Sequence, residues 1–214
     1  MSRPPARPDP RHSPGPARSA APHARHQVRI IGGQWRRSLL PVADKPGLRP
    51  SPDRVRETLF NWLGQDLSGW RVLDAFAGSG ALGFEAASRG ATDVVLLERD
   101  PDLVSALNGV RERLKAVGLR IQRADALVWM RAAEPASFDL VLLDPPFDAG
   151  LALPALQAAQ HLLVPGGLVY LEAGQPVPAD LPAGLSLLRA SRAGAVHFAL
   201  FQAQLEARSQ AAAG

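Results

Sequence analysis

Four consecutive residues, Asp144-Pro145-Pro146-Phe147, have the groups needed to hold a planar amine. They follow the apolar run "LVLL", which has the length of a buried strand. Consecutive prolines keep the backbone extended and donate no hydrogen bonds, so the Pro145 carbonyl is held beside the Asp144 carboxylate. Two fixed acceptors match the two N–H groups of an exocyclic amine, and Phe147 offers a flat face for stacking. These residues therefore predict chemistry on an amino group of a planar ring.

The stretch "DAFAGSGALG", from Asp74 to Gly83, predicts a nucleoside-binding turn. Its glycines have the G-x-G-x-x-G spacing of a dinucleotide-binding site, but an Asp ahead of the first glycine also suits S-adenosylmethionine. Both ligands need a tight turn and a helix N-terminus that presents N–H groups. Glu98 ends the next strand at roughly the 20-residue spacing of an acid that binds ribose hydroxyls, which fits either ligand.

Three features favour S-adenosylmethionine over a nicotinamide dinucleotide. Tyr170 is the only tyrosine, and the only lysines are Lys45 and Lys115, so a Tyr-x-x-x-Lys dehydrogenase site is impossible. Asp125 ends a third strand and can accept from an adenine amino group, while the N–H of Ala126 can meet a ring nitrogen. The third feature is the pair of acceptors after the fourth strand, which suits an amine that receives a methyl group.

Basic residues are concentrated in the N-terminal part of the chain, which has 214 residues and a net charge of +4. Residues 1–26 are rich in Pro and Arg, and residues 27–57 are also basic, which leaves the remainder acidic. This asymmetry suits a polyanionic partner such as RNA or DNA. The absence of cysteine excludes disulfides and thiolate metal sites, and no apolar run has the length of a membrane span. We expect a soluble, cytoplasmic protein without a metal.

Alternating strands and helices from Trp70 onward would position these residues. Apolar runs of strand length without period-two alternation are typical of parallel strands buried on both faces. They occupy 71–77, 93–99, 120–125, 139–146 and 167–173, with helices predicted at 80–89, 101–117, 126–134 and 151–163. This order predicts an α/β fold with a doubly wound sheet whose strand ends carry the site. Residues 185–204 predict an antiparallel hairpin at the sheet edge, turned at Arg192-Ala193-Gly194.

An N-terminal hairpin and a helix are predicted ahead of this sheet. The segment "QVRIIGGQWRRSLLPV" predicts a short β-hairpin with Gly32-Gly33 at its turn or bulge. In the helix that follows, Ser51 is expected at the N-cap and Pro52 at the first helical position. Helical spacing predicts a buried face that leaves Arg54 and Glu57 elsewhere and consists of Val55, Leu59, Trp62 and Leu63.

Four segments together resemble one enzyme family: "RIIGGQWR", "LRPSPDRVRETLFNWL", "LDAFAGSGALGFEAASRGA" and "DPPF". They are similar to the RsmD family, bacterial S-adenosylmethionine-dependent methyltransferases of a guanine N2 in 16S ribosomal RNA, over about residues 28–202. The resemblance implies a Rossmann-like class I methyltransferase fold, with a mostly parallel seven-stranded sheet, an antiparallel C-terminal hairpin and a small N-terminal hairpin. The chain would then divide into a disordered tail, 1–26; an RNA-facing hairpin and helix, 27–66; an S-adenosylmethionine-binding domain, 67–205; and a frayed tail, 206–214.

The resemblance also implies roles for individual residues. The residues expected to hold the target amine are Asp144, Pro145, Pro146 and Phe147. Those expected to bind S-adenosylmethionine are Arg49, Ser51, Asp74, Phe76, Gly78, Gly80, Glu98, Asp125 and Ala126. RNA would be held by Trp35, Arg36, Arg37 and Arg54, although Trp35 also suits the core of the hairpin. The family usually has W-R-G-R-K-L where this chain has "WRRSLL". We expect this difference to affect RNA binding more than the chemistry.

The implied partner is 16S ribosomal RNA or the small ribosomal subunit, and we expect a monomer. Other functions stay open on the residues alone. The DPPF residues would also serve an adenine-N6 nucleic-acid methyltransferase or a protein glutamine-N methyltransferase. A non-catalytic RNA-binding assembly factor could retain the same pocket, although the intact Asp144, Pro145 and Glu98 argue against it.

Overall fold

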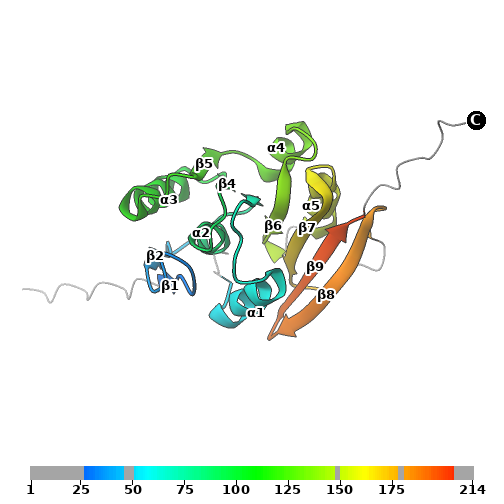
Figure 1. The fold of residues 1–214 in the computed structure, drawn as a ribbon, viewed down its shortest axis with the longest axis horizontal. Helices are drawn as coiled ribbons and strands as arrows, with labels where there is room; N and C mark the ends of the chain where they lie inside the picture. Colours follow the sequence, from blue (N-terminus) through cyan, green and yellow to red (C-terminus); the bar gives the residue numbers. More distant parts are fainter. Residues whose placement is uncertain (1–26, 46–50, 148–149, 178–180, 205–214) are drawn as a thin grey trace, which may run out of the picture.

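The described residues of the computed structural model form a central sheet with helices on both faces (Figure 1). They are residues 27–45, 51–147, 150–177 and 181–204. The predicted tails, 1–26 and 206–214, and the predicted cofactor residue Arg49 therefore lie outside the described part of the chain.

Seven strands make up the sheet, in the order β5-β4-β3-β6-β7-β9-β8. In chain order they are β3 (Arg71–Asp74), β4 (Asp93–Glu98), β5 (Leu119–Arg123), β6 (Phe138–Leu143), β7 (Leu163–Ala173), β8 (Leu185–Ala193) and β9 (Val196–Ala203). Strands β3 to β7 are parallel, whereas β9 runs antiparallel to both β7 and β8. The predicted doubly wound, mostly parallel sheet with a C-terminal hairpin is confirmed.

Two buried clusters hold the helices against opposite faces of the sheet. The first cluster joins the sheet to α1 (Asp53–Leu63), α2 (Ala81–Ser88) and α3 (Pro101–Leu114). The second joins it to α4 (Ala126–Ala132) and α5 (Ala152–Gln160). Along β4, Leu96 belongs to the first cluster and Leu97 to the second. Burial on both faces therefore explains the unbroken apolar runs of the parallel strands.

A separate two-stranded hairpin precedes the sheet, as predicted. Its strands β1 (Gln27–Arg29) and β2 (Leu39–Pro41) are antiparallel, and the loop between them lies against α2. Gly33 in this loop has φ +73°, and a Cβ there would come within 1.8 Å of the Ser88 carbonyl oxygen. Glycine is therefore required where the loop crosses the end of α2.

The predicted start of α1 is wrong by one residue. Pro52 occupies the N-cap, Asp53 is the first helical residue, and no side chain caps the helix. Ser51, the predicted cap, instead directs its hydroxyl to Asp144. The buried face of α1 also contains Arg56, which the apolar pattern does not include. Both differences arise from contacts with residues distant in the sequence.

One edge of the sheet gathers the carboxyl ends of the parallel strands. There β3 and β6 are neighbours, and the strand order reverses between them. The β8–β9 turn reaches the same edge, because His197 at the start of β9 pairs with Ala173 at the end of β7. In doubly wound sheets ligands bind outside the strand ends at this reversal. The candidate site is therefore expected at this edge.

Candidate active site

Asp74 and Asp144 lie on either side of the reversal in strand order. Asp74 ends β3 and pairs in register with Leu142 of β6, and Asp144 follows shortly after this pair. The two carboxylates are close enough that the charge of Asp74 raises the pKa of Asp144. The structure thus brings the glycine turn, which begins after Asp74, to the residues predicted to hold an amine.

The turn after β3 folds over the Asp74 carboxylate because of its glycines. The N–H of Gly83 donates to Asp74 Oδ2 at 2.9 Å, and a Cβ on Gly83 would lie 3.0 Å from the same oxygen and 2.7 Å from the Leu96 side chain. Gly80 has φ +78°, and a Cβ there would lie 2.7 Å from the side chain of Leu107. Larger residues at either position would push the turn away from the carboxylate.

Asp74 is buried, with 1% of its surface exposed, and its surroundings disfavour the ionised form. Burial raises the pKa of Asp74 to about 7, and the charges of Glu98 and Glu172 add to the rise, against the hydrogen bond from Gly83. A positively charged ligand beside Asp74 would favour its ionised form again. The turn therefore surrounds a carboxylate that suits a cation.

Glu98 connects the glycine turn to the end of β4. The carboxylate is half-buried and accepts hydrogen bonds from the N–H of Gly78 at 3.0 Å and the N–H of Asp100 at 2.8 Å. Glu98 therefore stands at the end of the second parallel strand and beside the turn, as the sequence predicts for an acid that meets a ribose.

The residues predicted to meet an adenine lie at the start of α4. Asp125 is the N-cap of this helix and accepts from the N–H of Val128 at 3.0 Å, while Ala126 is its first residue. Phe76 is half-buried against the second cluster, to which Ala126 also belongs. These residues follow β5 and β3, so they share the carboxyl edge with Glu98.

The four DPPF residues differ in exposure. Pro145 is buried, Asp144 is half-buried, and Pro146 is exposed together with Phe147, which is 45% exposed. Phe147 packs on Gly174, where a Cβ would come within 3.1 Å of the Phe147 Cβ. The glycine thus leaves room for an accessible aromatic ring close to Asp144.

The Asp144 carboxylate lies among other acids and contacts Ser51. Burial is the largest cause that raises the pKa of Asp144 well above its usual range, followed by the charges of Glu172 and Asp74. The Ser51 hydroxyl donates to Asp144 Oδ2 at 3.3 Å and lowers this pKa. Ser51 therefore contacts Asp144, one of the residues predicted to hold the target amine, and does not cap α1.

Glu172 is a site residue that the sequence reasoning missed. It is next to last in β7 and 1% exposed, and the Tyr170 hydroxyl donates to its Oε1 at 2.9 Å. The signal is present in "VYLEA", because an acid lies next to the end of the fifth parallel strand, close to where Asp74 and Glu98 end the first two.

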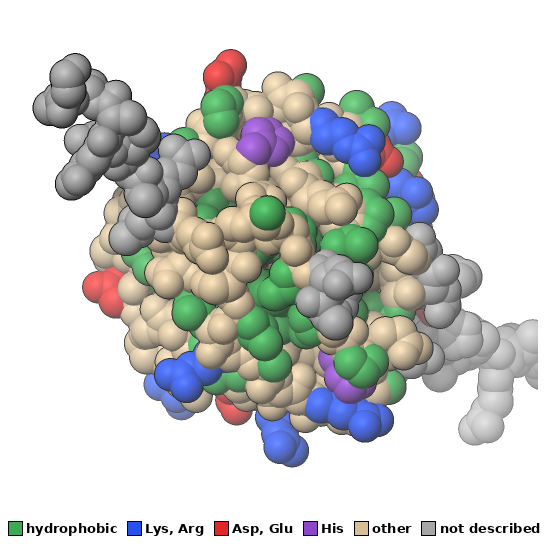
Figure 2. All heavy atoms as spheres, turned by 90° about the vertical axis from the view of Figure 1, so that its right-hand side faces the viewer, with side chains coloured by type: hydrophobic (Ala, Val, Ile, Leu, Met, Phe, Trp, Pro, Cys, Tyr) green, Lys and Arg blue, Asp and Glu red, His purple; other side chains and the backbone are tan. Residues whose placement is uncertain are grey.

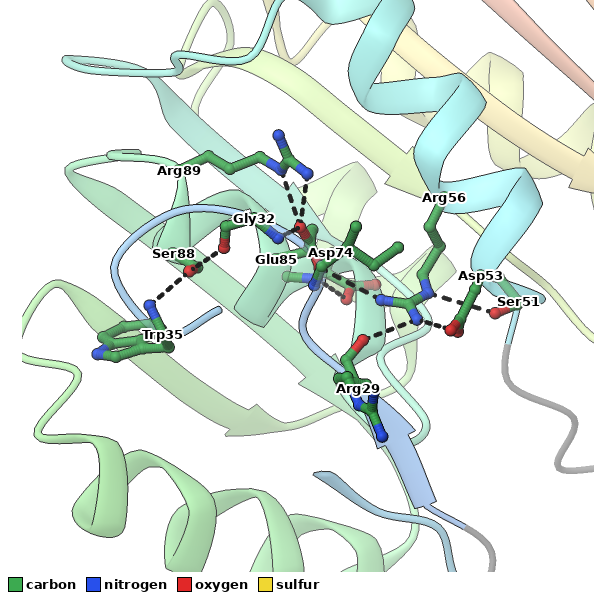
Figure 3. Close-up of polar contacts among 12 residues, drawn as sticks. Arg29, Gly32, Trp35, Ser51, Asp53, Arg56, Asp74, Glu85, Ser88 and Arg89 are labelled. Carbon is green, nitrogen blue, oxygen red and sulfur yellow. Dashed lines mark hydrogen bonds and ion pairs between the residues drawn. The ribbon is translucent and has the colours of Figure 1, made fainter. Parts of the chain in front are cut away.

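Figure 3 shows a buried ion network between the N-terminal hairpin, α1 and α2. Arg56 of α1 and Glu85 of α2 are both fully buried, with Arg56 Nη1 3.3 Å from Glu85 Oε2. Arg56 also donates to the backbone carbonyls of Ser51 at 3.3 Å and Arg29 at 2.9 Å. It therefore helps to fix the residue that contacts Asp144.

Glu85 fastens the loop of the hairpin to α2. Its carboxylate accepts from the N–H of Ile31 at 2.7 Å and the N–H of Gly32 at 2.8 Å. The guanidinium of Arg89 donates to Glu85 Oε1 at 2.8 Å, which adds to the contact with Arg56. One buried carboxylate thus joins two helices and the hairpin loop.

The residues predicted to bind RNA fall into two groups. Arg36, Arg37 and Arg54 are exposed. Trp35 is half-buried against the first cluster, and its backbone N–H donates to Ser88 Oγ at 2.9 Å (Figure 3). Trp35 therefore packs against the core, which is the alternative role that its sequence context suggested. The side chains of Arg36, Arg37 and Arg54 are accessible to solvent.

Further basic side chains lie at the other end of the carboxyl edge. Exposed Arg192 pairs across the hairpin with His197, which in turn pairs with Ala173. Figure 2 views the β8 side of the molecule and shows Lys and Arg around its rim, with apolar side chains toward the middle. The sequence reasoning did not include Arg192 or His197 among the basic residues near the site.

No helix in the described ranges has the length and hydropathy of a membrane span. Within the same part of the chain, no group of three or more His, Asp or Glu side chains is arranged to hold a metal ion.

Comparisons with known proteins agree with this geometry. The family model described as "Conserved hypothetical protein 95" matches residues 28–202. The chain is 42% identical over 195 residues to "Ribosomal RNA small subunit methyltransferase D" of Escherichia coli (strain K12), and the match covers 86% of this chain and 94% of that protein.

Solved structures share the fold. A "Putative methyltransferase yhhF from Escherichia coli" is 41% identical, with a TM-score of 0.75, and covers 85% of this chain and 100% of that one. An RNA methyltransferase from Salinibacter ruber in complex with S-adenosyl-L-homocysteine has a TM-score of 0.56 at 19% identity, over 73% of this chain and 94% of that one, and shares the fold alone. With the fold, the family match and these relatives in agreement, the chain belongs to the RsmD family and is a methyltransferase.

Proposed function

We propose that this enzyme transfers a methyl group from S-adenosylmethionine to the exocyclic N2 amine of a guanine in 16S ribosomal RNA. The observation that carries the proposal is the place of Asp144 and Pro145, beside the glycine turn at the reversal of strand order. The name of the 42% identical Escherichia coli relative supports a small-subunit ribosomal RNA as substrate. Such an enzyme would act in the cytoplasm, as a monomer, on the RNA or on the small subunit.

The acidic site suits S-adenosylmethionine, which carries a sulfonium and an ammonium group. Asp74, Asp144 and Glu172 each have a raised pKa, and burial is the largest cause for each. A cation nearby would favour their ionised forms. The ribose would lie on Glu98 and the adenine by Asp125 and Ala126. The residues nearest the methionine end would be Asp74, Phe76, Gly78 and Gly80, with Arg49 and Ser51 closing over it.

Asp144 and the Pro145 carbonyl would each accept one N–H of the target amine. The lone pair of guanine N2 is delocalised into the ring, and these hydrogen bonds favour a pyramidal nitrogen with a directed lone pair. Alignment for in-line displacement is the main contribution of the two residues. S-adenosylmethionine supplies the electrophilic methyl group. The nitrogen becomes acidic as it is methylated, and Asp144 takes its proton.

Phe147 would stabilise the target base outside its helix. The N2 amine lies at the minor-groove edge of a paired guanine, so the base must be unpaired or flipped out to reach Asp144. The 45% exposed ring of Phe147 offers a stacking surface worth about 1–3 kcal/mol. Arg36, Arg37 and Arg54 would hold the phosphates that flank this base.

Replacing Glu98 with alanine should weaken the binding of S-adenosylmethionine by about 10-fold or more, because a hydrogen bond to a charged group contributes about 1.5–3 kcal/mol. Titration calorimetry with the full chain measures this affinity. Asp102→Ala is the matched control, because Asp102 is an exposed acid in the first turn of α3, close to Glu98 in the chain. Equal affinities of the wild-type and Glu98→Ala proteins would remove Glu98 from the binding site.

Exchanging both Arg36 and Arg37 for glutamine should weaken RNA binding and leave the affinity for S-adenosylmethionine unchanged. The slope of log affinity against log salt should become shallower by about 1 for each phosphate that the variant no longer binds. Fluorescence anisotropy with a 16S RNA fragment over a salt series measures this slope. The control is Arg131→Gln, an exposed arginine on α4 at the opposite face of the sheet. The same slope in both variants would show that the hairpin does not bind the RNA backbone.

Mass spectrometry of nucleosides tests the proposed function itself. Incubation with S-adenosylmethionine and unmodified 16S RNA, or small subunits, should yield N2-methylguanosine. N6-methyladenosine or a methylated protein glutamine would identify one of the other targets. No binding of S-adenosylmethionine in the calorimeter would favour a non-catalytic assembly factor.

A further inference from the structure

Glu172 lies in the centre of the site, but the transfer described above does not use it. Its side chain is buried at the end of β7 and accepts a hydrogen bond from the buried Tyr170 hydroxyl. Burying a carboxylate is costly unless partners compensate, and such groups gather at functional sites. The position of Glu172 beside Asp144 and Asp74 therefore calls for a role in the reaction.

Glu172 and Asp144 lie side by side at the ends of neighbouring strands, and the Ser51 hydroxyl contacts Asp144. Ser51 is 5% exposed, and its Oγ lies 3.3 Å from Asp144 Oδ2. Leu143 of β6 pairs in register with Leu171 of β7, so Asp144 and Glu172 are the next residues on the two neighbouring strands. Two carboxylates held side by side in a buried site repel each other when both are ionised. The geometry therefore favours a state in which one of the two acids keeps a proton.

Charged and titratable groups face this pair from several elements. They are Asp74 of β3, Arg56 of α1 and Tyr170 of β7, with Glu98 of β4 beyond Asp74. The charge of Arg56 acts on Glu172, although Arg56 is already paired with Glu85 and Asp53. The surroundings of Asp144 are therefore acidic, whereas those of Glu172 include a cation.

These surroundings act differently on the two acids. Burial raises the pKa of both, and the charge of Glu172 raises the pKa of Asp144 further. The Ser51 and Tyr170 hydroxyls and the charge of Arg56 lower the pKa of Glu172. Glu172 is thus the better placed of the two to be ionised, and Asp144 the better placed to keep the shared proton.

We propose that Glu172 is a positioning residue for the methyl transfer: it lies beside Asp144 at the ends of neighbouring strands and, together with the Ser51 hydroxyl, sets the protonation state of that carboxylate. The inference rests on the proposed function, since Asp144 holds the target amine there. In the transfer the N–C bond forms, the S–C electron pair stays on sulfur, and the amine proton passes to ionised Asp144. A protonated Asp144 cannot accept that proton. Glu172 therefore makes the reaction depend on pH and on the positive charge bound nearby.

The pH profile of methyl transfer at saturating S-adenosylmethionine tests this role in two variants. Glu172→Gln keeps the shape of the side chain and removes its charge, so Asp144 should ionise more readily and the acid limb should move to lower pH by about one unit or more. Ser51→Ala removes a hydrogen bond that stabilises ionised Asp144, so its acid limb should move to higher pH. A merely structural role for Glu172 would lower the rate without shifting the limb.

Carbon-13 NMR of the Asp144 carboxyl, assigned with Asp144→Asn, gives a readout that does not depend on the reaction. In the full chain without S-adenosylmethionine, the titration midpoint should fall in Glu172→Gln and rise in Ser51→Ala. An unchanged midpoint in Glu172→Gln overturns the inference. If that variant does not fold, an unchanged or lower midpoint in Ser51→Ala overturns it. Shifted midpoints in a protein that methylates no guanine would leave the pairing intact and refute the proposed substrate instead.

Discussion

Replacing Asp144 with alanine should lower the rate of methyl transfer by about 10³-fold and leave the binding of S-adenosylmethionine largely intact. Asp144 follows β6 at the reversal of strand order, where with the Pro145 carbonyl it would align the amine. Alanine removes this acceptor and also the group that takes the amine proton. The glycine turn and Glu98 stay in place. Single-turnover rates on 16S RNA and calorimetry with S-adenosylmethionine measure the two effects separately.

Asparagine at position 144 is the matched control. Its amide oxygen keeps one hydrogen-bond acceptor but does not take up a proton at neutral pH, so the rate should lie between those of alanine and the wild type. Full turnover by Asp144→Ala would show that the carboxylate does not hold the amine. A large decrease in S-adenosylmethionine affinity in the same variant would place Asp144 among the cofactor-binding residues instead.

The sheet and the edge that carries the site follow from local signals in the sequence. Strand β4 shows an apolar run because Leu96 and Leu97 face different clusters, and such runs separated by helices leave few arrangements of the chain. Gly83 is needed because a Cβ would press on Leu96 and Asp74, which belong to the strands directly before and after α2 in the chain. The relative position of Asp74 and Asp144 then follows from the strand order alone.

The positions of Ser51 and Arg56 could not be predicted in this way, because their partners are distant in the sequence. The pattern Ser-Pro-Asp favours Ser51 as a helix cap, yet its hydroxyl contacts Asp144, 93 residues away. Charged residues are rarely fully buried, so the apolar pattern of α1 does not place Arg56 in the core. Its burial depends on Glu85, 29 residues away on another helix. Only the tertiary fold supplies these partners.

Replacing Glu85 with alanine should lower the free energy of unfolding by about 3–5 kcal/mol, because removing one partner leaves a buried charge uncompensated. Here buried Arg89 would lose its pairing with Glu85, the fully buried Arg56 would lose one of its two acid partners and retain Asp53, and the N–H groups of Ile31 and Gly32 would have no acceptor from Glu85. For a chain of this size the melting temperature should fall by about 6–20 °C. Urea denaturation and calorimetric scanning measure the two quantities.

The same variant should also loosen the N-terminal hairpin. Strands β1 and β2 form a sheet of their own, so the loop between them depends on Glu85 in addition to apolar packing. Limited proteolysis should therefore cut Glu85→Ala within residues 27–41 sooner than the wild type. Glu57→Ala, at an exposed acid on α1, should change stability by less than about 0.5 kcal/mol. If the two variants behaved alike, the network would contribute no more than a surface ion pair, and Ser51 would owe its position beside Asp144 to other interactions.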